Sequence, residues 1–336
     1  MAHHSAATTT TFADQVRAIP GGEHLELCYS CGTCVSKCMI QQKVDPEYNP
    51  RRLLRMVMMD MREAAFENPT TWLCSACDLC YPACPQEIHI SGVIAAVKQL
   101  AVEAGYTSPL ETVSVDEDAC SGCGICVLAC PYEAPHLVEK EINGVMDRVS
   151  EVDANKCMGC GTCVAACPLG AIARPGVAND DIVAQIPTSV VSNGAPTLVT
   201  FICDWSLRAD DDLSLLASYP DNVRVIHIPC TGRIDPEMAL RALRSGVDGV
   251  LVCGCAPGEC HYKRGTDVSA CKIGLLNLMF DQMSAVGGSV PGSAWGQGRV
   301  RFVQIGTQDR GRIRSEVDSM LDNLAALKNG HKEAGQ

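Results

Sequence analysis

Short apolar runs alternate with amphipathic stretches in the last third of the chain. Four runs read as buried strands, at residues 198–203, 223–228, 250–253 and 300–305. Between them, Asp235 followed by Pro236 is typical of a helix start, and residues 236–244, 270–284 and 309–328 carry the helical period. This alternation predicts a doubly wound α/β domain over residues 197–330.

The first part of the chain has helical periodicity only. Asn49 and Pro50 suit the N-cap and first position of a helix that continues through residues 51–59. A second helix is expected to begin at Ser91 and to end at Gly105. The pattern predicts a small helical domain over residues 13–105, preceded by an Ala- and Thr-rich tail, residues 1–12, that is expected to be disordered.

The middle of the chain, residues 106–175, contains an internal duplication. Its two halves are offset by 37 residues, from Cys120 to Cys157, which indicates two similar structures packed together. A stretch with Pro, Gly, Ser and Asn, residues 176–196, is expected to be a linker. The whole chain is therefore predicted to be a multidomain α+β protein.

Composition adds one unusual value, since 22 of the 336 residues are cysteine. Disulfide scaffolds are usually short chains with irregular cysteine spacing, so metal ligation is the better interpretation. The N-terminus lacks the features of a secretory signal, and no apolar stretch reaches the roughly 18 to 20 residues of a membrane-spanning helix. We therefore expect a cytoplasmic protein in a reducing, anaerobic compartment, with no membrane span.

The net charge of −12 is concentrated in residues 106–195, which hold 12 acidic and 4 basic residues. Nucleic acid is therefore not expected as a partner. An acidic surface fits a basic docking surface on another subunit, and it also fits plain solvation; charge alone leaves both open.

Sixteen of the cysteines form four runs with one spacing, C-x2-C-x2-C-x3-C. The runs are Cys28, Cys31, Cys34 and Cys38; Cys74, Cys77, Cys80 and Cys84; Cys120, Cys123, Cys126 and Cys130; and Cys157, Cys160, Cys163 and Cys167. This spacing lets a tight loop bring three sulfurs to three corners of one 4Fe-4S cluster. Structural zinc is the alternative, but zinc sites usually pair two C-x2-C units. The runs predict four 4Fe-4S clusters.

In two-cluster ferredoxins the fourth cysteine of a run binds the other cluster. By that analogy the ligand sets in the middle domain are Cys120, Cys123, Cys126 and Cys167, and Cys157, Cys160, Cys163 and Cys130. In the first domain they are Cys28, Cys31, Cys34 and Cys84, and Cys74, Cys77, Cys80 and Cys38.

Nearly the whole chain resembles known redox proteins. The first segment resembles the C subunit of heterodisulfide reductase, in Cys28-Tyr29-Ser30-Cys31-Gly32-Thr33-Cys34 and from Trp72-Leu73-Cys74 to Cys84-Pro85, with Met39 where a proline usually follows the fourth cysteine. The middle is similar to the two-cluster ferredoxin insert in the A subunit of that reductase. The third segment resembles the delta subunit of methyl-viologen-reducing hydrogenase, in Phe201-Ile202-Cys203-Asp204-Trp205, in residues 229–236 and in residues 254–262.

The third resemblance implies a 2Fe-2S cluster, although that family often has a cysteine where this chain has Ser206. The predicted strands agree, because Cys203, Cys230 and Cys255 lie at or just past strand ends at the edge where such sheets gather ligands, and Cys260 follows on a Gly-bearing loop. Buried cysteines that act as small apolar residues are the alternative. The other two cysteines, Cys253 and Cys271, are expected to be packing residues.

Other side chains near these motifs have secondary roles. His261 could tune the nearby cluster through a hydrogen bond to sulfur. Lys263 and Arg264 could contact a partner's flavin or acidic surface, although surface solvation fits them better. The remaining histidines singled out, His89, His136 and His227, are expected to be structural.

The sequence contains no G-x-G-x-x-G in strand-to-helix context, no P-loop and no signature of the catalytic subunit of heterodisulfide reductase. No catalytic residue is predicted, so we expect an electron-transfer subunit. The resemblance implies a flavin-containing partner similar to the A subunit of heterodisulfide reductase, and a second redox partner such as a hydrogenase, a formate dehydrogenase or a reductase. The alternative is a self-contained reductase with a substrate site at the C-terminal cluster; a redox-sensing module has no support in the sequence.

Overall fold

The computed structural model describes residues 10–186, 194–206, 219–285, 298–306, 309 and 311–334. The chain divides into two compact units, Met1–Leu110 and Glu111–Gln336. Most of the expected tail, residues 1–9, lies outside the described residues, as do residues 187–193 of the expected linker.

The first unit is helical, as the sequence predicted. Its elements are α1 (Phe12–Ala18), a 3-10 turn (Leu25–Leu27), α2 (Thr33–Ser36), α3 (Met39–Lys43), α4 (Pro50–Met58), α5 (Arg62–Glu67), α6 (Pro69–Leu73) and α7 (Ile90–Glu103). The side chain of Asn49 accepts a hydrogen bond from the Arg52 backbone and caps α4, with Pro50 in the first position.

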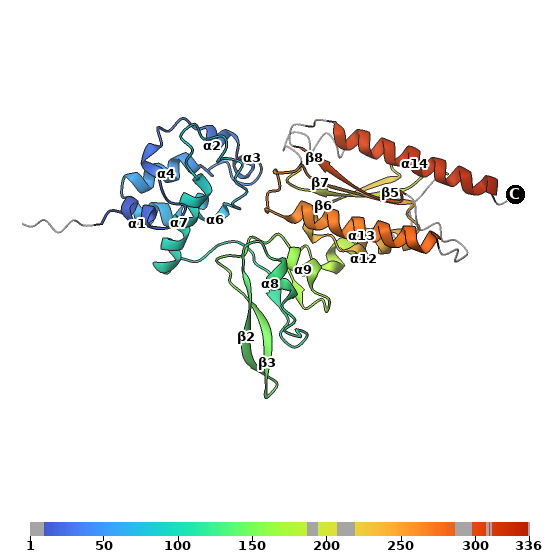
Figure 1. Ribbon diagram of the computed structural model, residues 1–336, viewed down its shortest axis with the longest axis horizontal. Coiled ribbons are helices and arrows are strands. Elements are labelled where there is room, and N and C mark those ends of the chain that lie inside the picture. The colour runs from blue at the N-terminus through green and yellow to red at the C-terminus, as the bar shows by residue number, and fades with distance from the viewer. Residues whose placement is uncertain are drawn as a thin grey trace, which may run out of the picture. The chain divides into compact units, whose positions relative to one another are not determined.

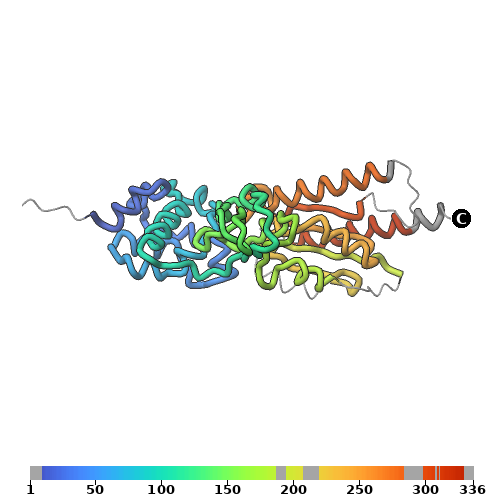
Figure 2. The backbone as a smooth tube through the Cα atoms, turned by 90° about the horizontal axis from the view of Figure 1, so that it is seen from below, coloured from blue at the N-terminus to red at the C-terminus, as the bar shows by residue number. Residues whose placement is uncertain are grey.

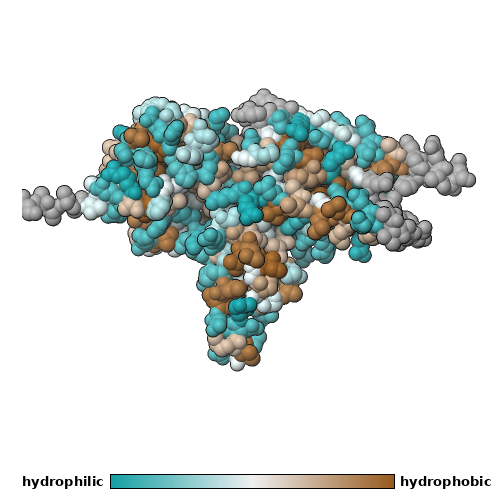
Figure 3. Space-filling view, in the orientation of Figure 1, coloured by the Kyte–Doolittle hydropathy of each residue, from teal (hydrophilic) through white to brown (hydrophobic). Residues whose placement is uncertain are grey.

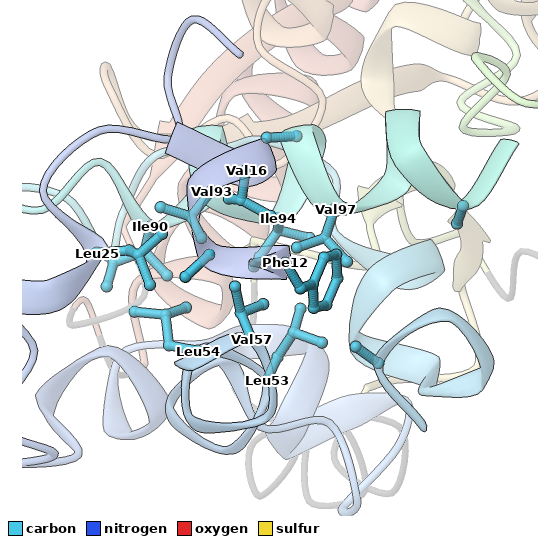
Figure 4. Packing of buried hydrophobic residues seen from close by; sticks show 14 of the residues in the cluster. Phe12, Val16, Leu25, Leu53, Leu54, Val57, Ile90, Val93, Ile94 and Val97 are labelled. Carbon is cyan, nitrogen blue, oxygen red and sulfur yellow. The ribbon is translucent and has the colours of Figure 1, made fainter. Parts of the chain in front are cut away.

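One apolar core holds these short helices together. Figure 4 shows Phe12 and Val16 of α1 packed against Leu53 and Val57 of α4 and against residues of α7. Phe12 is fully buried and its ring meets the Phe66 ring edge-on at 5.4 Å. The placement of Phe12 in a disordered tail was therefore wrong, because this aromatic side chain is needed to close the core.

The second unit opens with the duplicated segment. Strands β1 (Ser114–Val115) and β4 (Ile172–Ala173) pair antiparallel, and the helices α8 (Ile125–Ala129) and α9 (Thr162–Ala166) occupy equivalent places in the two halves. Strands β2 (Pro135–Ile142) and β3 (Val145–Val152) form a hairpin that the sequence analysis missed (Figure 1). Its turn is Asn143-Gly144, with φ of 52° and 83°, which suits the tight two-residue turn of a twisted hairpin.

The rest of the second unit contains a four-stranded parallel sheet. Its strands are β5 (Leu198–Cys203), β6 (Val223–Ile228), β7 (Gly249–Cys255) and β8 (Val300–Ile305), in the order β6-β5-β7-β8. A 3-10 turn, η2 (Thr231–Arg233), follows β6, and the helices are α12 (Pro236–Arg244), α13 (Gly265–Ala285) and α14 (Arg312–Ala334). The prediction of a C-terminal parallel sheet is confirmed.

Helices cover both faces of this sheet. Residues of α12 and α13 share one apolar cluster with the strands, and residues of α14 share another (Figure 1). In the tube view, α13 and α14 run alongside the strands (Figure 2). This arrangement leaves the carboxyl ends of the strands as the edge where side chains from β5, β6 and β7 meet.

The segment expected to be a linker is in part structured. Residues Asn179–Val183 form α10, and Ile182 and Ile186 are buried in the same cluster as α12 and α13. The linker interpretation was therefore wrong for residues 176–186, because two isoleucines four residues apart give this short helix an apolar face.

Candidate cluster-binding sites

In the first unit, the thiols of the first run meet the last cysteine of the second. Cys28, Cys31, Cys34 and Cys84 line one cavity. The loop turns through Ser30 and Gly32, with φ of 63° and 85°. Burial, followed by the charges of Cys28 and Cys31, raises the pKa of Cys34 to about 11. Cys84 of the second run therefore lies with three cysteines of the first run.

The second group in this unit consists of Cys38, Cys74, Cys77 and Cys80. The pKa of Cys80 is raised by burial and then by the charges of the other three thiols. Burial raises the pKa of Cys38 and of Cys74, and the hydroxyl of Tyr48, which is 2% exposed, lies within hydrogen-bonding reach of both sulfurs and opposes that rise. Tyr48 therefore joins the two cysteine runs at this site.

The second unit repeats this geometry. One cavity is lined by Cys120, Cys123, Cys126 and Cys167, and another by Cys130, Cys157, Cys160 and Cys163. In the first of these sites the backbone N–H of Ser150 donates to the Cys120 sulfur at 3.5 Å, and Cys126 donates to the Ser150 hydroxyl at 3.3 Å. Strand β3 thus supplies polar contacts to this ligand loop.

The two sites of the duplication differ in exposure. Cys157, Cys160 and Cys163 are all buried, whereas Cys123 is exposed. Beside Cys123, Ile125 is 42% exposed and Leu128 is 84% exposed, and Figure 3 shows apolar side chains gathered over the α8 region. Two nearly identical cysteine patterns therefore sit in different environments.

Four further thiols converge at the carboxyl edge of the parallel sheet. The sulfurs of Cys203, at the end of β5, and Cys255, at the end of β7, are 3.7 Å apart. Cys260 accepts hydrogen bonds from Cys230 and Cys255, and these hold its pKa well below the ordinary value. The hydrogen bonds that Cys230 and Cys255 donate, together with burial, raise their own pKa values.

Small and aromatic residues shape this C-terminal site. A Cβ atom on Gly265 would lie 2.0 Å from the Cys230 sulfur, so only glycine fits at the start of α13. His261 is buried and stacks on Trp205, with ring centroids 3.4 Å apart. The Ser206 hydroxyl donates to the Cys203 carbonyl at 2.8 Å.

The remaining candidates have other roles. Cys253 is buried in the apolar cluster that contains residues of α14, as expected of a packing residue. Cys271 is exposed, so the assignment of Cys271 as a packing residue was wrong. Lys263 lies over the Tyr132 ring at 5.1 Å. Two of the histidines contact carboxylate oxygens, His89 that of Asp78 at 3.2 Å and His227 that of Asp204 at 3.4 Å.

The thiol groups fit iron–sulfur clusters chemically. In the groups around Cys34, Cys80 and Cys163, desolvation and then the charges of neighbouring thiolates raise the pKa of the named thiol, which means that the thiolates repel one another. An iron–sulfur centre bound by these thiolates would relieve this repulsion through its positive charge. Within the described part of the chain, no group of three or more His, Cys, Asp or Glu residues forms a site for a single metal ion.

Sequence reasoning missed three residues that support the sites, namely Tyr48, Arg174 and Arg233. Arg233 is 0% exposed although its charge disfavours burial, and burial lowers its pKa to about 10. Arg174 donates a hydrogen bond to the Gly159 carbonyl at 2.6 Å. No motif marks these residues, because their importance comes from contacts between distant segments.

Comparison with known proteins agrees with this geometry. The family described as methyl-viologen-reducing hydrogenase, delta subunit, matches residues 198–328. In Methanocaldococcus jannaschii, the iron-sulfur D subunit of the F420-non-reducing hydrogenase vhu is 33% identical over 95 residues, which are 28% of this chain and 70% of that protein. The chain belongs to the family of these delta subunits.

Two further relatives of the chain are subunits of heterodisulfide reductases. The A subunit of the ferredoxin:CoB-CoM heterodisulfide reductase of Methanosarcina mazei is 42% identical over 98 residues, 28% of this chain and 12% of that protein. The C subunit of the H(2):CoB-CoM heterodisulfide,ferredoxin reductase of Methanothermobacter marburgensis is 30% identical over 98 residues, 29% of this chain and 51% of that protein. The chain thus spans only a part of each of these two proteins.

Three family models of 4Fe-4S dicluster domains match this chain, at residues 24–88, 73–134 and 119–172. They confirm that the chain carries multiple 4Fe-4S clusters. The match at 73–134 contains the second and third cysteine runs. In the structure, the second run instead contacts the first, because Cys38 lies with Cys74, Cys77 and Cys80. A repeated spacing lets a two-run pattern match any two consecutive runs, so this match does not identify which thiols lie together.

Proposed function

We propose that this chain is the electron-transfer subunit of a cytoplasmic redox complex related to heterodisulfide reductase and hydrogenase. It would bind four 4Fe-4S clusters through the four crossed cysteine sets. A 2Fe-2S cluster would be bound by Cys203, Cys230, Cys255 and Cys260. When bound, such clusters accept and release single electrons.

The observation that carries the proposal is the packing of one ligand loop against the C-terminal site. Residue Thr162, within the loop of Cys157, Cys160 and Cys163, lies so close to η2 that a Cβ on Gly232 would be 2.8 Å from its hydroxyl. The pKa of Cys230, at the other site, is raised by its hydrogen bond to Cys260 and by burial, and the charge of Cys160 adds to this rise. Two sets of buried thiols in direct proximity suit a relay within one chain.

Burial at the C-terminal site favours a relay over substrate chemistry. Cys203 and Cys230 are each 1% exposed and Cys255 is 2% exposed. Side chains that cover the thiols exclude water and leave little room for a substrate at an iron. The self-contained reductase is therefore the weaker candidate.

The names of the relatives support a hydrogenase or a heterodisulfide reductase as a redox partner. On the resemblance in sequence, we also propose a flavin-containing partner similar to the A subunit of heterodisulfide reductase, and a formate dehydrogenase as another candidate for the second redox partner. In the part of the chain that the structure describes, no helix is long and apolar enough to cross a bilayer. We also assign the segments to a helical two-cluster domain, a ferredoxin-like two-cluster domain and a doubly wound domain.

Iron and sulfide quantification of anaerobically purified protein tests the assignment. The ligand inventory predicts about 18 irons per chain, from four cubanes and one binuclear centre. Cys255→Ser should reduce the value to about 16 and remove one EPR signal, whereas the matched control Cys253→Ala, on the same strand, should keep about 18. A value near 16 for the unaltered chain would remove the C-terminal cluster, and bound zinc in place of iron would reject the proposal.

Turnover measurements separate the two candidate functions. Reduction of a substrate by the isolated chain with an artificial electron donor would favour the self-contained reductase. For a relay protein, we expect turnover only after a flavin-containing partner is added.

A further inference from the structure

The ligand loop of Cys157, Cys160 and Cys163 is held between two arginine side chains. Arg233 is fully buried, and its stem lies against the loop, because a Cβ on Gly161 would be 2.7 Å from the Arg233 Cδ. Its Nε donates to the Val177 carbonyl and its Nη2 to the Asn179 side chain, both at 2.7 Å. Its Nη1 is buried and has no hydrogen-bond partner among the described residues.

Arg174 approaches the same loop at Gly159. Its Nη1 donates to the Gly159 carbonyl at 2.6 Å, and a Cβ on that glycine would lie 3.2 Å from the guanidinium carbon. Its Nε is also buried without a hydrogen-bond partner in the described part of the chain. Two arginine side chains therefore border one ligand loop, Arg233 with its stem and Arg174 with its guanidinium group, and each guanidinium group has a donor that no described protein atom satisfies.

The equivalent loop of Cys120, Cys123 and Cys126 has no such arrangement among the described residues. The counterpart of Gly161 is Gly124, where a Cβ would meet the Leu137 side chain at 3.4 Å. The counterpart of Gly159 is Gly122, where a Cβ would meet the backbone carbonyl of Arg148. Arg148 itself is exposed. The duplication therefore preserves the cysteines and differs in the charge beside them.

Charge beside a site affects its reduction because one electron adds one negative charge. A buried cation stabilises that added charge more than an exposed one, since solvent screens the latter. Asp181 and Asp235 also interact electrostatically with Arg233, but Asp181 is exposed and Asp235 is half-buried, so water weakens their opposing effect.

We propose that Arg233 and Arg174 raise the reduction potential of the cluster bound at Cys130, Cys157, Cys160 and Cys163 above that of its duplicated counterpart. Both act as positioning residues, since they hold the ligand loop and fix positive charge beside it. This inference rests on the proposed function. It makes the site that packs against the C-terminal thiols the better electron acceptor of the pair.

The experiment is an EPR-monitored redox titration of the full-length protein, purified anaerobically, with iron counted in each sample. Arg233→Met should lower one midpoint potential and leave the others unchanged. The expected fall is at least tenfold in the equilibrium constant for reduction, which is about 59 mV for one electron. Arg233→Lys should retain most of the potential, and Arg148→Met, the matched control beside the other loop, should change none.

Each outcome decides the inference. An unchanged midpoint in Arg233→Met with full iron content overturns it and leaves the proposed function intact, as does an equal shift in Arg148→Met. If Arg233→Met loses iron, Arg174→Met carries the test, and an unchanged midpoint there also overturns the inference. If the unaltered chain holds no iron, the proposed function itself fails.

Discussion

At the scale of single residues, Tyr48 shows how one side chain serves two cysteine runs. It is buried, and its hydroxyl lies within hydrogen-bonding reach of Cys38 of the first run and of Cys74 of the second. Hydrogen bonds to sulfur stabilise negative charge on a cluster and raise its potential. We therefore expect Tyr48 to tune the electron affinity of a cluster bound at this site without binding iron itself.

Replacing Tyr48 by Phe should therefore lower one midpoint potential while the iron content stays the same. The loss of a hydrogen bond to a charged group is worth roughly 1.5 kcal/mol. A redox titration measures the shift. Tyr29→Phe is the control, because Tyr29 also bonds a ligand thiol, Cys31, but is 60% exposed, where water can replace the hydroxyl. Equal shifts in both variants would contradict this account.

At the scale of elements, two of the ligand loops contain a glycine that begins a short helix of the duplicated segment. Gly124 precedes α8 and Gly161 precedes α9, with φ of 76° and 78°. Residues with a Cβ rarely adopt this left-handed conformation. The two glycines differ in what lies beside them, since a Cβ on Gly161 would clash with Arg233 and one on Gly124 would make an ordinary contact.

Alanine at either position should cost about 1 to 2 kcal/mol through the left-handed backbone alone. Gly161→Ala should destabilise the chain further, because the stem of the buried Arg233 must move. We expect a lower thermal unfolding midpoint for Gly161→Ala than for Gly124→Ala, measured anaerobically by circular dichroism. A larger loss in Gly124→Ala would show that Arg233 is not constrained by this contact.

At the scale of the whole molecule, the chain consists of two compact units that meet in sequence at Leu110 and Glu111. Each unit has its own apolar core, formed by α1, α4 and α7 in the first and around the parallel sheet in the second. Each unit also contains complete crossed cysteine sets, so no ligand set draws on both.

Residues 111–336 produced alone should therefore fold and bind about 10 irons, from two cubanes and one binuclear centre. Anaerobic iron counting and EPR check this value, with the full-length chain as the reference. A shortened chain that retains no iron would mean that the second unit depends on the first for folding.

Much of the architecture could be predicted because its signals are local. Asn49-Pro50 and Asp235-Pro236 set the starts of α4 and α12, and runs of β-branched residues marked the strands of the sheet. The hairpin of β2 and β3 had a local signal too, in Asn143-Gly144, which the sequence analysis passed over. The structured part of the expected linker was harder, because Ile182 and Ile186 form a helix face only where the core of another segment receives them.

The sequence by itself determined the ligand chemistry, since the spacing of a cysteine run fixes how a short loop can present its thiols. It also determined the number of cysteine runs and the parallel direction of the strands in the C-terminal sheet. The tertiary structure alone decided which environment each run receives. Burial of Arg233 against Gly161, and of Tyr48 against two thiols, depends on segments far apart in the chain. Electrostatic stabilisation depends on distance and on the exclusion of water, and neither is encoded in a local pattern.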